Sequence, residues 1–262
     1  YDSDASYIVF QSAHIIMNLD LRPILEEHIA RGEDITVLYK KIDDADREFG
    51  NSNLFDIDEN GYVRRARKNE GKEKNANVSL EVWIINREVL AEVIHRHNEV
   101  SSTFGMRETL AWLVEIGAYK MHAHEFKGYA RCFDSLPHYV EYSFELLDRD
   151  VAEQLFVPDW PIYTQTHDTP PALYGENADV RNSFVSNGCI VEGEVTDSIL
   201  CRGVKIGKGA VIKRAIILSQ VSVGDEVKLG DVVVDKYSII TARHTIKGDP
   251  YNIIYLKQGA IL

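Results

Sequence analysis

Cysteine is scarce in this chain of 262 residues, and a long hydrophobic run is absent. The three cysteines, Cys132, Cys189 and Cys201, are an odd number without C-x-x-C spacing, which argues against a disulfide framework and a structural zinc site. No apolar stretch approaches the roughly 18 residues that span a bilayer, and no signal peptide is recognisable. We therefore expect a protein of the reducing cytoplasm with no membrane partner.

Basic residues are fewer than acidic residues in this chain. The chain has 29 Lys and Arg against 41 Asp and Glu, a formal net charge of −12, which argues against nucleic acid as the main partner. Apolar residues make up 45% and charged residues 27%, a globular composition with room for one or two domains. Tyr1 stands where an initiator Met would, and we expect an N-terminally truncated fragment.

Residues 1–157 alternate between strand-like and helix-like patterns, which predicts an α/β domain with a mixed sheet. A strand–helix–strand order across residues 6–39 implies a parallel strand pair, and Asn60-Gly61 predicts a hairpin turn with positive φ at both positions. The expected strands are 6–11, 35–39, 54–57, 62–64, 78–85 and 119–126, and the expected helices are 21–30, 87–97, 106–116 and 136–155.

The pattern changes after residue 157. Prolines mark residues 158–182 as a linker, and residues 183–262 have β-branched side chains at short regular intervals with glycine at the corners. This period predicts a parallel β-helix of hexapeptide repeats, in which each short strand places an apolar side chain inside. An irregular β-sandwich is the alternative, but its strands need longer runs. The period is set by Ile206, Ile212, Ile217, Val223, Leu229, Val234 and Ile240.

Two motifs that would indicate chemistry are missing. The chain has no Gly-Gly and no G-x-G-x-x-G, so it lacks the common backbone cradle for nucleotide phosphates. No histidine occurs between Arg181 and Thr241. Hexapeptide acyltransferases use a histidine base, and its absence from the predicted β-helix argues against acyl transfer.

Three further motifs have simple structural explanations. The basic stretch 64–74 could meet a phosphate, but a solvated loop explains it better. His122-x-His124 has a spacing that strand metal sites use, yet no third ligand is identifiable nearby. Asp134-Ser135 could supply a functional carboxylate, although a helix N-cap accounts for both residues.

Two segments resemble the ADP-glucose pyrophosphorylases, a family of sugar-nucleotide pyrophosphorylases. Residues 159–173, DWPIYTQTHDTPPAL, resemble the family's linker, in which W-P-I-x-T precedes P-P-A. Residues 183–193, SFVSNGCIVEG, resemble the family's entry into its β-helix. The resemblance implies a nucleotidyltransferase-like (Rossmann-like) α/β domain, incomplete at its N-terminus, followed by a left-handed parallel β-helix.

The residues that hold Mg²⁺ in that family are replaced here. The family's G-D-H motif reads Ser12-Ala13-His14, and the Asp of W-R-D-V-G-T is matched by Cys132. Mg²⁺ is a hard cation held by carboxylate oxygens, and both expected carboxylates are gone. We therefore expect no catalytic residue, no metal site and no cofactor in this chain.

The family's sugar-phosphate pocket is altered as well. Its E-K-P motif appears as residues 67–69, and its S-M-G-I-Y motif appears as residues 79–83, with Glu81 in place of the glycine. A carboxylate there would crowd and repel a sugar phosphate. The degenerate pocket is expected to comprise His14, Lys68, Ser79, Glu81, Arg131 and Asp134.

The loss of both carboxylates resembles the GlgD-type regulatory subunit of this family. That resemblance implies a non-catalytic subunit of glucose-1-phosphate adenylyltransferase in bacterial glycogen biosynthesis. It also implies hetero-oligomers with a catalytic, Mg²⁺-binding subunit, formed through the β-helix and the α/β domain. An anionic metabolite effector is implied at the junction of the domains, with Arg181, Lys205, Lys213 and Lys68 as the expected contacts.

Three alternative functions remain open from the sequence. An active adenylyltransferase would need substitute metal ligands, for which Asp134 and Glu81 are the candidates. A hexapeptide acyltransferase would need a base other than histidine. A purely structural assembly module would change the size of an oligomer without changing its kinetics.

Overall fold

The chain folds into two compact units, which we describe separately. The computed structural model describes residues 4–100 and 105–262. The first unit extends to Asp134 and includes Val157–Trp160, and the second consists of Ser135–Phe156 and Pro161–Leu262. In the described ranges, no helix is both long and apolar enough to cross a membrane.

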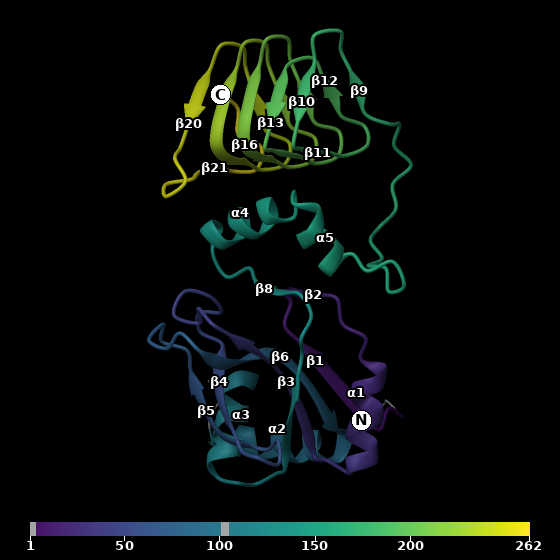
Figure 1. Cartoon of the computed structure of the whole chain (residues 1–262), viewed down its shortest axis with the longest axis vertical. Coiled ribbons are helices and arrows are strands. Elements are labelled where there is room, and N and C mark those ends of the chain that lie inside the picture. Colours follow the sequence, from purple (N-terminus) through teal and green to yellow (C-terminus); the bar gives the residue numbers. More distant parts are fainter. Residues whose placement is uncertain (1–3, 101–104) are drawn as a thin grey trace. The chain divides into compact units, whose positions relative to one another are not determined.

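The first unit is built on a six-stranded mixed sheet (Figure 1). Five strands follow the order β5-β4-β6-β3-β7. The sixth strand, β1, pairs with β6 as well. A separate two-stranded sheet joins β2 to β8. The strands are β1 (Tyr7–Gln11), β2 (Ile15–Met17), β3 (Ile35–Ile42), β4 (Asn53–Ile57), β5 (Val63–Lys68), β6 (Ala76–Asn86), β7 (Met121–Glu125) and β8 (Ala130–Cys132).

The expected mixed sheet is confirmed, but one predicted pairing is wrong. β1 and β3 are not hydrogen-bonded to each other, because β6 pairs antiparallel with both. The parallel partner of β3 is instead β7. The pattern of residues 6–39 indicates the strand directions correctly, but it contains no information about a strand that enters from later in the chain.

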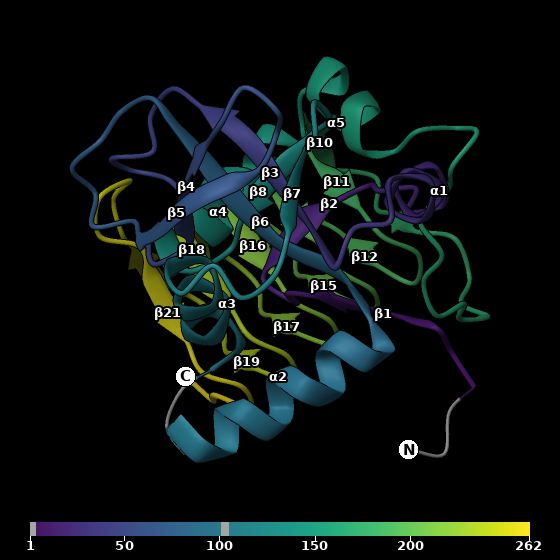
Figure 2. The ribbon, with the colours of Figure 1, turned by 90° about the horizontal axis from the view of Figure 1, so that it is seen from below.

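Helices cover both faces of the six-stranded sheet. The helix α1 (Arg22–Arg31), viewed nearly down its axis in Figure 2, packs through Ile24 on one face. The helices α2 (Arg87–Val100) and α3 (Met106–Glu115) pack through Val93 and Leu113 in the core cluster of the other face. The expected end of α1 is confirmed, because Gly32 adopts φ 63° and caps the helix.

The turn between β4 and β5 differs from the predicted one. Gly61 has φ 86°, but Asn60 does not have positive φ. The Asp58 carboxylate accepts hydrogen bonds from the backbone N–H groups of Asn60 and Tyr62, both at 2.9 Å. These bonds favour a longer turn in which only the glycine is left-handed.

The second unit is a parallel β-solenoid, as the repeat predicts. Its strands stack on equivalent strands of the next coil, and the pairings between the described strands are parallel. Val191, Ile206, Val223 and Ile240 form one such row, and all four are buried in a single core. The strands are β9 (Leu173–Tyr174), β10 (Asp179–Arg181), β11 (Phe184–Val185), β12 (Ile190–Val191), β13 (Glu194–Thr196), β14 (Ile199–Leu200), β15 (Lys205–Ile206), β16 (Val211–Ile217), β17 (Ser222–Val223), β18 (Lys228–Val234), β19 (Ile239–Ile240), β20 (Thr245–Lys247) and β21 (Ile254–Leu256).

The single helix expected over residues 136–155 is two helices, α4 (Leu136–Glu145) and α5 (Arg149–Leu155). The break follows from Asp148, whose carboxylate caps α5 by accepting from the Asp150 N–H at 2.8 Å. Val140 of α4 packs on Ile216 and Val233 of the β-helix. Ile216 and Val233 thus belong to an outward-facing row of the β-helix. This row is apolar because α4 covers it (Figure 1).

Candidate functional site

Strand pairing in the first unit brings together four of the residues singled out by sequence. Residues 12–14 connect β1 to β2, Glu81 lies in β6, and Cys132 ends β8. The Ser12 N–H donates to the Glu81 carbonyl oxygen at 3.1 Å, and the Phe133 N–H donates to the His14 carbonyl oxygen at 2.7 Å. Ala13, His14, Glu81 and Cys132 thus belong to one cluster, which we call the degenerate site.

The two positions expected to lack carboxylates do not fit a Mg²⁺ ion. Ala13 is exposed and supplies a methyl group, whereas Cys132 is fully buried. Burial, together with the carboxylates of Asp134 and Glu81, raises the pKa of the Cys132 thiol to about 12. The thiol is therefore protonated near neutral pH, and a protonated thiol is not a ligand for a hard cation.

Glu81 is held in an unusual conformation inside this cluster. Its φ is 53°, in the left-handed region that favours glycine. Its side chain is 6% exposed and forms an ion pair with Arg107, with 2.7 Å between Oε1 and Nη2. His14 lies further away, with Nε2 at 3.8 Å from Oε2 of Glu81. Glu81, which stands where the family's motif has glycine, thus has a backbone conformation that favours glycine, and its side chain places a carboxylate inside the cluster.

Arg107 was not predicted from the sequence. It lies in the first turn of α3, and its guanidinium also donates to the Asn51 carbonyl oxygen at 2.6 Å. Glu81 and Arg107 are far apart in the chain and belong to different elements, so no local motif indicates their contact. Only the packing of α3 beside the sheet brings the charges together.

Two other residues of the expected pocket, Ser79 and Arg131, have structural contacts. Ser79 Oγ accepts from the Glu81 N–H at 3.1 Å, so it supports the backbone conformation of Glu81 within β6. Lys68 is exposed at the end of β5. Arg131 faces Glu48 at 3.6 Å and lies against the Tyr129 ring.

Asp134 and Ser135 lie between the end of β8 and the start of α4. β8 ends at Cys132, so Asp134 lies beyond the strand. The Asp134 carboxylate contributes to the raised pKa of Cys132. Ser135 caps α4 by accepting from the His138 N–H at 3.3 Å, which confirms the expected N-cap. Asn69, at the position of the family's proline, is buried and donates to the carbonyl oxygen of Ala45 at 2.8 Å.

The histidine pair has separate partners. His122 is buried against the edge of the Tyr62 ring, and burial lowers its pKa. The ring of His124 is 2.9 Å from the Glu27 carboxylate. Within residues 4–100 and 105–262, no group of three or more His, Cys, Asp or Glu side chains is arranged to hold a metal ion.

The basic stretch 64–74 lies mostly in solvent and makes local ion pairs. Arg64 pairs with Asp58, and Arg67 pairs with Glu73. Lys72 pairs with Glu70, and each of these pairs is partly or largely exposed. These contacts agree with the interpretation of a solvated segment.

The three β-helix residues expected to contact an effector lie on two different sheets. Lys205 belongs to the sheet that contains β9 and β19. Arg181 and Lys213 share a row of the other sheet, with Thr196 between them. Arg181 is already paired with Asp179 at 2.5 Å, whereas Lys213 is exposed and lines a cavity of about 390 Å³ on the β-helix.

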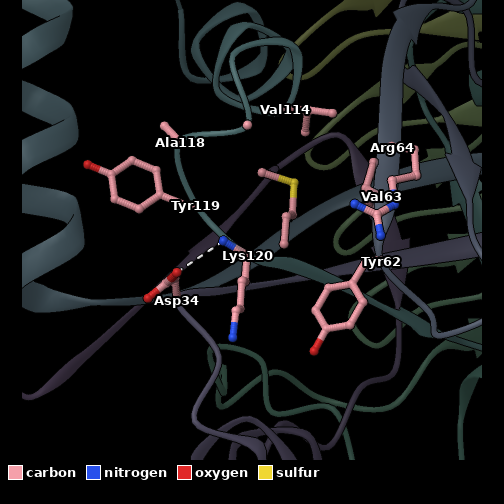
Figure 3. Close-up of a pocket in the computed structure, with 10 residues that line it drawn as sticks. Asp34, Tyr62, Val63, Arg64, Val114, Ala118, Tyr119 and Lys120 are labelled. Carbon is pink, nitrogen blue, oxygen red and sulfur yellow. Dashed lines mark hydrogen bonds between the residues drawn. The ribbon is translucent and has the colours of Figure 1, made fainter.

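A separate cavity of about 630 Å³ lies at the edge of the first unit where β5 and β7 begin (Figure 3). Two aromatic rings, Tyr62 and Tyr119, stand on opposite sides of the lining, and Lys120 lies between them. The backbone N–H of Lys120 donates to the Asp34 carboxylate at 3.0 Å. None of the degenerate-site residues lines this cavity.

Comparison with known proteins finds a matching family model and similar sequences. A family model described as "GlmU-like, C-terminal hexapeptide" matches residues 170–252. The glycogen biosynthesis protein GlgD of Bacillus subtilis is 30% identical over 213 residues, which is 80% of this chain and 50% of that protein. A glucose-1-phosphate adenylyltransferase of Fervidobacterium nodosum is 28% identical over 237 residues, 89% of this chain and 56% of that protein.

The chain is similar in sequence to the ADP-glucose pyrophosphorylase family. Within this family it is similar to GlgD, and a 70-residue stretch is 59% identical to GlgD of Geobacillus stearothermophilus, covering 27% of this chain and 20% of that protein. The chain spans about half the length of the relatives from Bacillus subtilis and Fervidobacterium nodosum. The family resemblance expected from residues 159–173 and 183–193 is confirmed.

The buried thiol of Cys132 predicts a specific pH dependence. The folded thiol ionises near pH 12 and an unperturbed thiol near 9.0, so the folded state binds more protons between these values. The free energy of unfolding must therefore fall as pH rises through this window. We expect Cys132→Ala to make that fall shallower, measured by urea unfolding at several pH values above 8.

Alkylation of the thiols provides the control for this prediction. In the folded protein at pH 8, Cys132 should resist iodoacetamide, and it should react once urea unfolds the chain. An identical pH dependence for wild type and Cys132→Ala, or alkylation of Cys132 in the folded state, would contradict the prediction.

Proposed function

We propose that this chain is part of a non-catalytic regulatory subunit of glucose-1-phosphate adenylyltransferase, acting in bacterial glycogen biosynthesis. The observation that carries the proposal is the degenerate site. Ala13 and the buried, protonated Cys132 occupy the two positions where the family has metal-binding carboxylates. Nucleotidyl transfer brings several negative charges together and depends on a metal ion to neutralise them.

The Glu81–Arg107 ion pair supports the same proposal. The Glu81 carboxylate occupies the position where the family's glycine lets the sugar phosphate approach, and it already has a cationic partner at 2.7 Å. A sugar phosphate would have to enter beside a buried negative charge, which disfavours binding. An active enzyme that used Glu81 and Asp134 as substitute metal ligands would first have to separate Glu81 from Arg107.

The partner implied by this function is a catalytic subunit of the same family. We propose that the full-length polypeptide forms hetero-oligomers with that subunit in the cytoplasm, using both the β-helix and the α/β unit. The similarity to GlgD of Bacillus subtilis, over 80% of this chain, supports this assignment.

Kinetics of the catalytic subunit test the proposal. The full-length polypeptide that contains this chain should form no ADP-glucose from ATP and glucose 1-phosphate when assayed alone. Added to the catalytic subunit of the same organism, it should change kcat, KM or the response to effectors. The measurement is ADP-glucose formation with each protein alone and with both, alongside light scattering of the mixture.

Three outcomes would overturn the proposal. Turnover by the polypeptide alone, lost on mutation of Asp134, would favour an active enzyme with substitute ligands. A larger oligomer with unchanged kinetics would favour a structural assembly module. Acetyl transfer from acetyl-CoA would favour the remaining alternative, a hexapeptide acyltransferase.

A further inference from the structure

The cavity of about 630 Å³ shown in Figure 3 is built at one end of the sheet of the first unit. Asp34 and Lys120 directly precede β3 and β7, which pair with each other in parallel. Tyr62 directly precedes β5 and forms an antiparallel bridge with His122 of β7. The strand pairing therefore brings three residues from distant parts of the chain to one edge, apart from the degenerate site.

The end of α3 supplies the opposite side of this cavity. Gly117 has φ 61°, and its N–H donates to the Val114 carbonyl oxygen at 3.1 Å. The Ala118 N–H donates to another carbonyl oxygen of the last turn of α3, at 3.3 Å. This left-handed helix end returns the chain to the sheet. Tyr119, the next residue, consequently stands across the cavity from Tyr62 (Figure 3).

Both tyrosine rings are held in place by the protein. The Tyr62 hydroxyl donates to Oε1 of Glu33 at 2.9 Å, and its ring meets that of His122 edge to face. The hydroxyl oxygen of Tyr119 is buried, and it points away from Tyr62 in Figure 3. Burial and the Glu92 carboxylate raise the pKa of the Tyr119 hydroxyl to about 12, so it stays protonated. Because the rings are fixed in advance, a ligand that contacts them loses little free energy in ordering them.

The charges around the cavity balance. The charged side chains in its lining are those of Asp34, Arg64 and Lys120. Arg64 already forms an ion pair with Asp58, at 2.6 Å, which leaves one carboxylate and one ammonium group. One oxygen of Asp34 accepts the Lys120 N–H at 3.0 Å, and among the described residues the other has no hydrogen-bond partner. A matching ligand therefore needs hydrogen-bonding groups but no charge.

The lining combines two kinds of surface that suit a sugar. Val63, Val114 and Met121 add apolar surface to that of the two rings. A pyranose has apolar C–H faces, which pack on the negative face of an aromatic ring. Its rim of hydroxyl groups both donates and accepts, so it can bond to a carboxylate and to an ammonium group. The cavity volume lies in the range of about 300–1,000 Å³ that is typical of small-molecule sites.

We propose that this cavity binds a neutral oligosaccharide. Its sugar rings pack on Tyr62 and Tyr119, and its hydroxyl groups bond to Asp34 and Lys120. A phosphorylated ligand is disfavoured, because the lining has no surplus of positive charge to match it. The binding site stands apart from the proposed function, and only the choice of an α-linked glucan as one of the probes rests on that function.

Calorimetric titration with two uncharged oligosaccharides, maltohexaose and cellohexaose, tests the site. The full-length polypeptide should bind at least one of them, and added salt should leave the affinity unchanged because the ligand has no charge. Tyr119→Leu, which keeps apolar bulk but removes the ring, should weaken binding by about three- to tenfold. Asp34→Asn, which weakens the acceptor, should have an effect of about the same size. Tyr119→Phe keeps the ring and should bind like the wild type.

The matched control is Tyr251→Ala, which removes a tyrosine ring that is 99% exposed and lies outside this cavity. Its affinity for the oligosaccharide should equal that of the wild type. The proposal is overturned if neither oligosaccharide binds, or if Tyr251→Ala weakens binding as much as Tyr119→Leu. It is also overturned if Tyr119→Leu and Asp34→Asn, both folded by circular dichroism, bind like the wild type.

The outcomes separate this site from the proposed function. A polypeptide that binds an oligosaccharide at this cavity but leaves the kinetics of the catalytic subunit unchanged would support the site and count against the proposed function. A polypeptide that changes those kinetics but binds neither oligosaccharide would support the proposed function and overturn the site. Binding of maltohexaose in preference to cellohexaose would support the site and connect it to the α-linked glucan of glycogen.

Discussion

Arg107→Ala should lower the free energy of unfolding of the α/β unit by about 3 kcal/mol near neutral pH. The substitution removes the cation at 2.7 Å from the Glu81 carboxylate, and that carboxylate is only 6% exposed. His14, at 3.8 Å, remains the nearest cationic candidate and is a weaker partner. A buried charge without its partner is costly, which is why the loss should exceed that of a surface pair.

Tryptophan fluorescence is a suitable probe, because Trp83, Trp112 and Trp160 all belong to the first unit. Lys41→Ala is the matched control: it breaks the Lys41–Glu125 pair, whose lysine is 62% exposed, and should cost less than about 1 kcal/mol. The double variant Glu81→Gly/Arg107→Ala should recover most of the loss, since it removes the carboxylate and suits the φ of 53°. Equal effects of Arg107→Ala and Lys41→Ala would refute the prediction.

Gly193→Ala should be among the most damaging single substitutions in the β-helix. A Cβ at this position would meet the carbonyl oxygen of Ala210 well inside van der Waals distance and that of Gly207 at 2.9 Å. Both atoms are backbone of the next coil, so the clash can be relieved only by separating the coils. We expect a loss of about 3 kcal/mol or more, at the upper end for overpacking.

Gly230→Ala provides the comparison within the same β-helix. Its nearest neighbour would be Lys247 Cγ at 3.5 Å, an ordinary contact, and its stability should stay within about 0.5 kcal/mol of the wild type. Hydrogen exchange of the amides in β12, β13 and β16 measures the effect locally. Comparable protection in the two variants would show that the close approach at Gly193 does not limit the stacking.

The β-helix could be predicted from the sequence because the repeat of inward-facing apolar residues that specifies it is local. Each inward residue, such as Ile206 or Val223, is buried by the coil above and the coil below, so a simple period reveals it. The first coil was missed for the same reason. Leu173 and Tyr174 of β9 follow a proline-rich stretch with no period before them, and the predicted start at residue 183 is late.

The α/β unit was less predictable because its key contacts are distant in sequence. The strands of the six-stranded sheet were located, but β2 and β8 were not. In addition, β6 separates β1 from β3, which no local pattern records. The degenerate site was found by comparing motifs, which gave Ala13, Glu81 and Cys132. Its electrostatic partner Arg107 was not found, since an isolated arginine in a predicted helix has no sequence signature.

The helix α4 determines how this polypeptide can be divided for expression. A fragment that starts at the linker would leave the row of Ile199, Ile216 and Val233 bare on the side that α4 normally covers. Exposed contiguous apolar surface of this kind promotes aggregation. A soluble β-helix piece therefore has to begin at Ser135, which caps α4, so the repeat region carries its own cover from a segment that precedes the repeats.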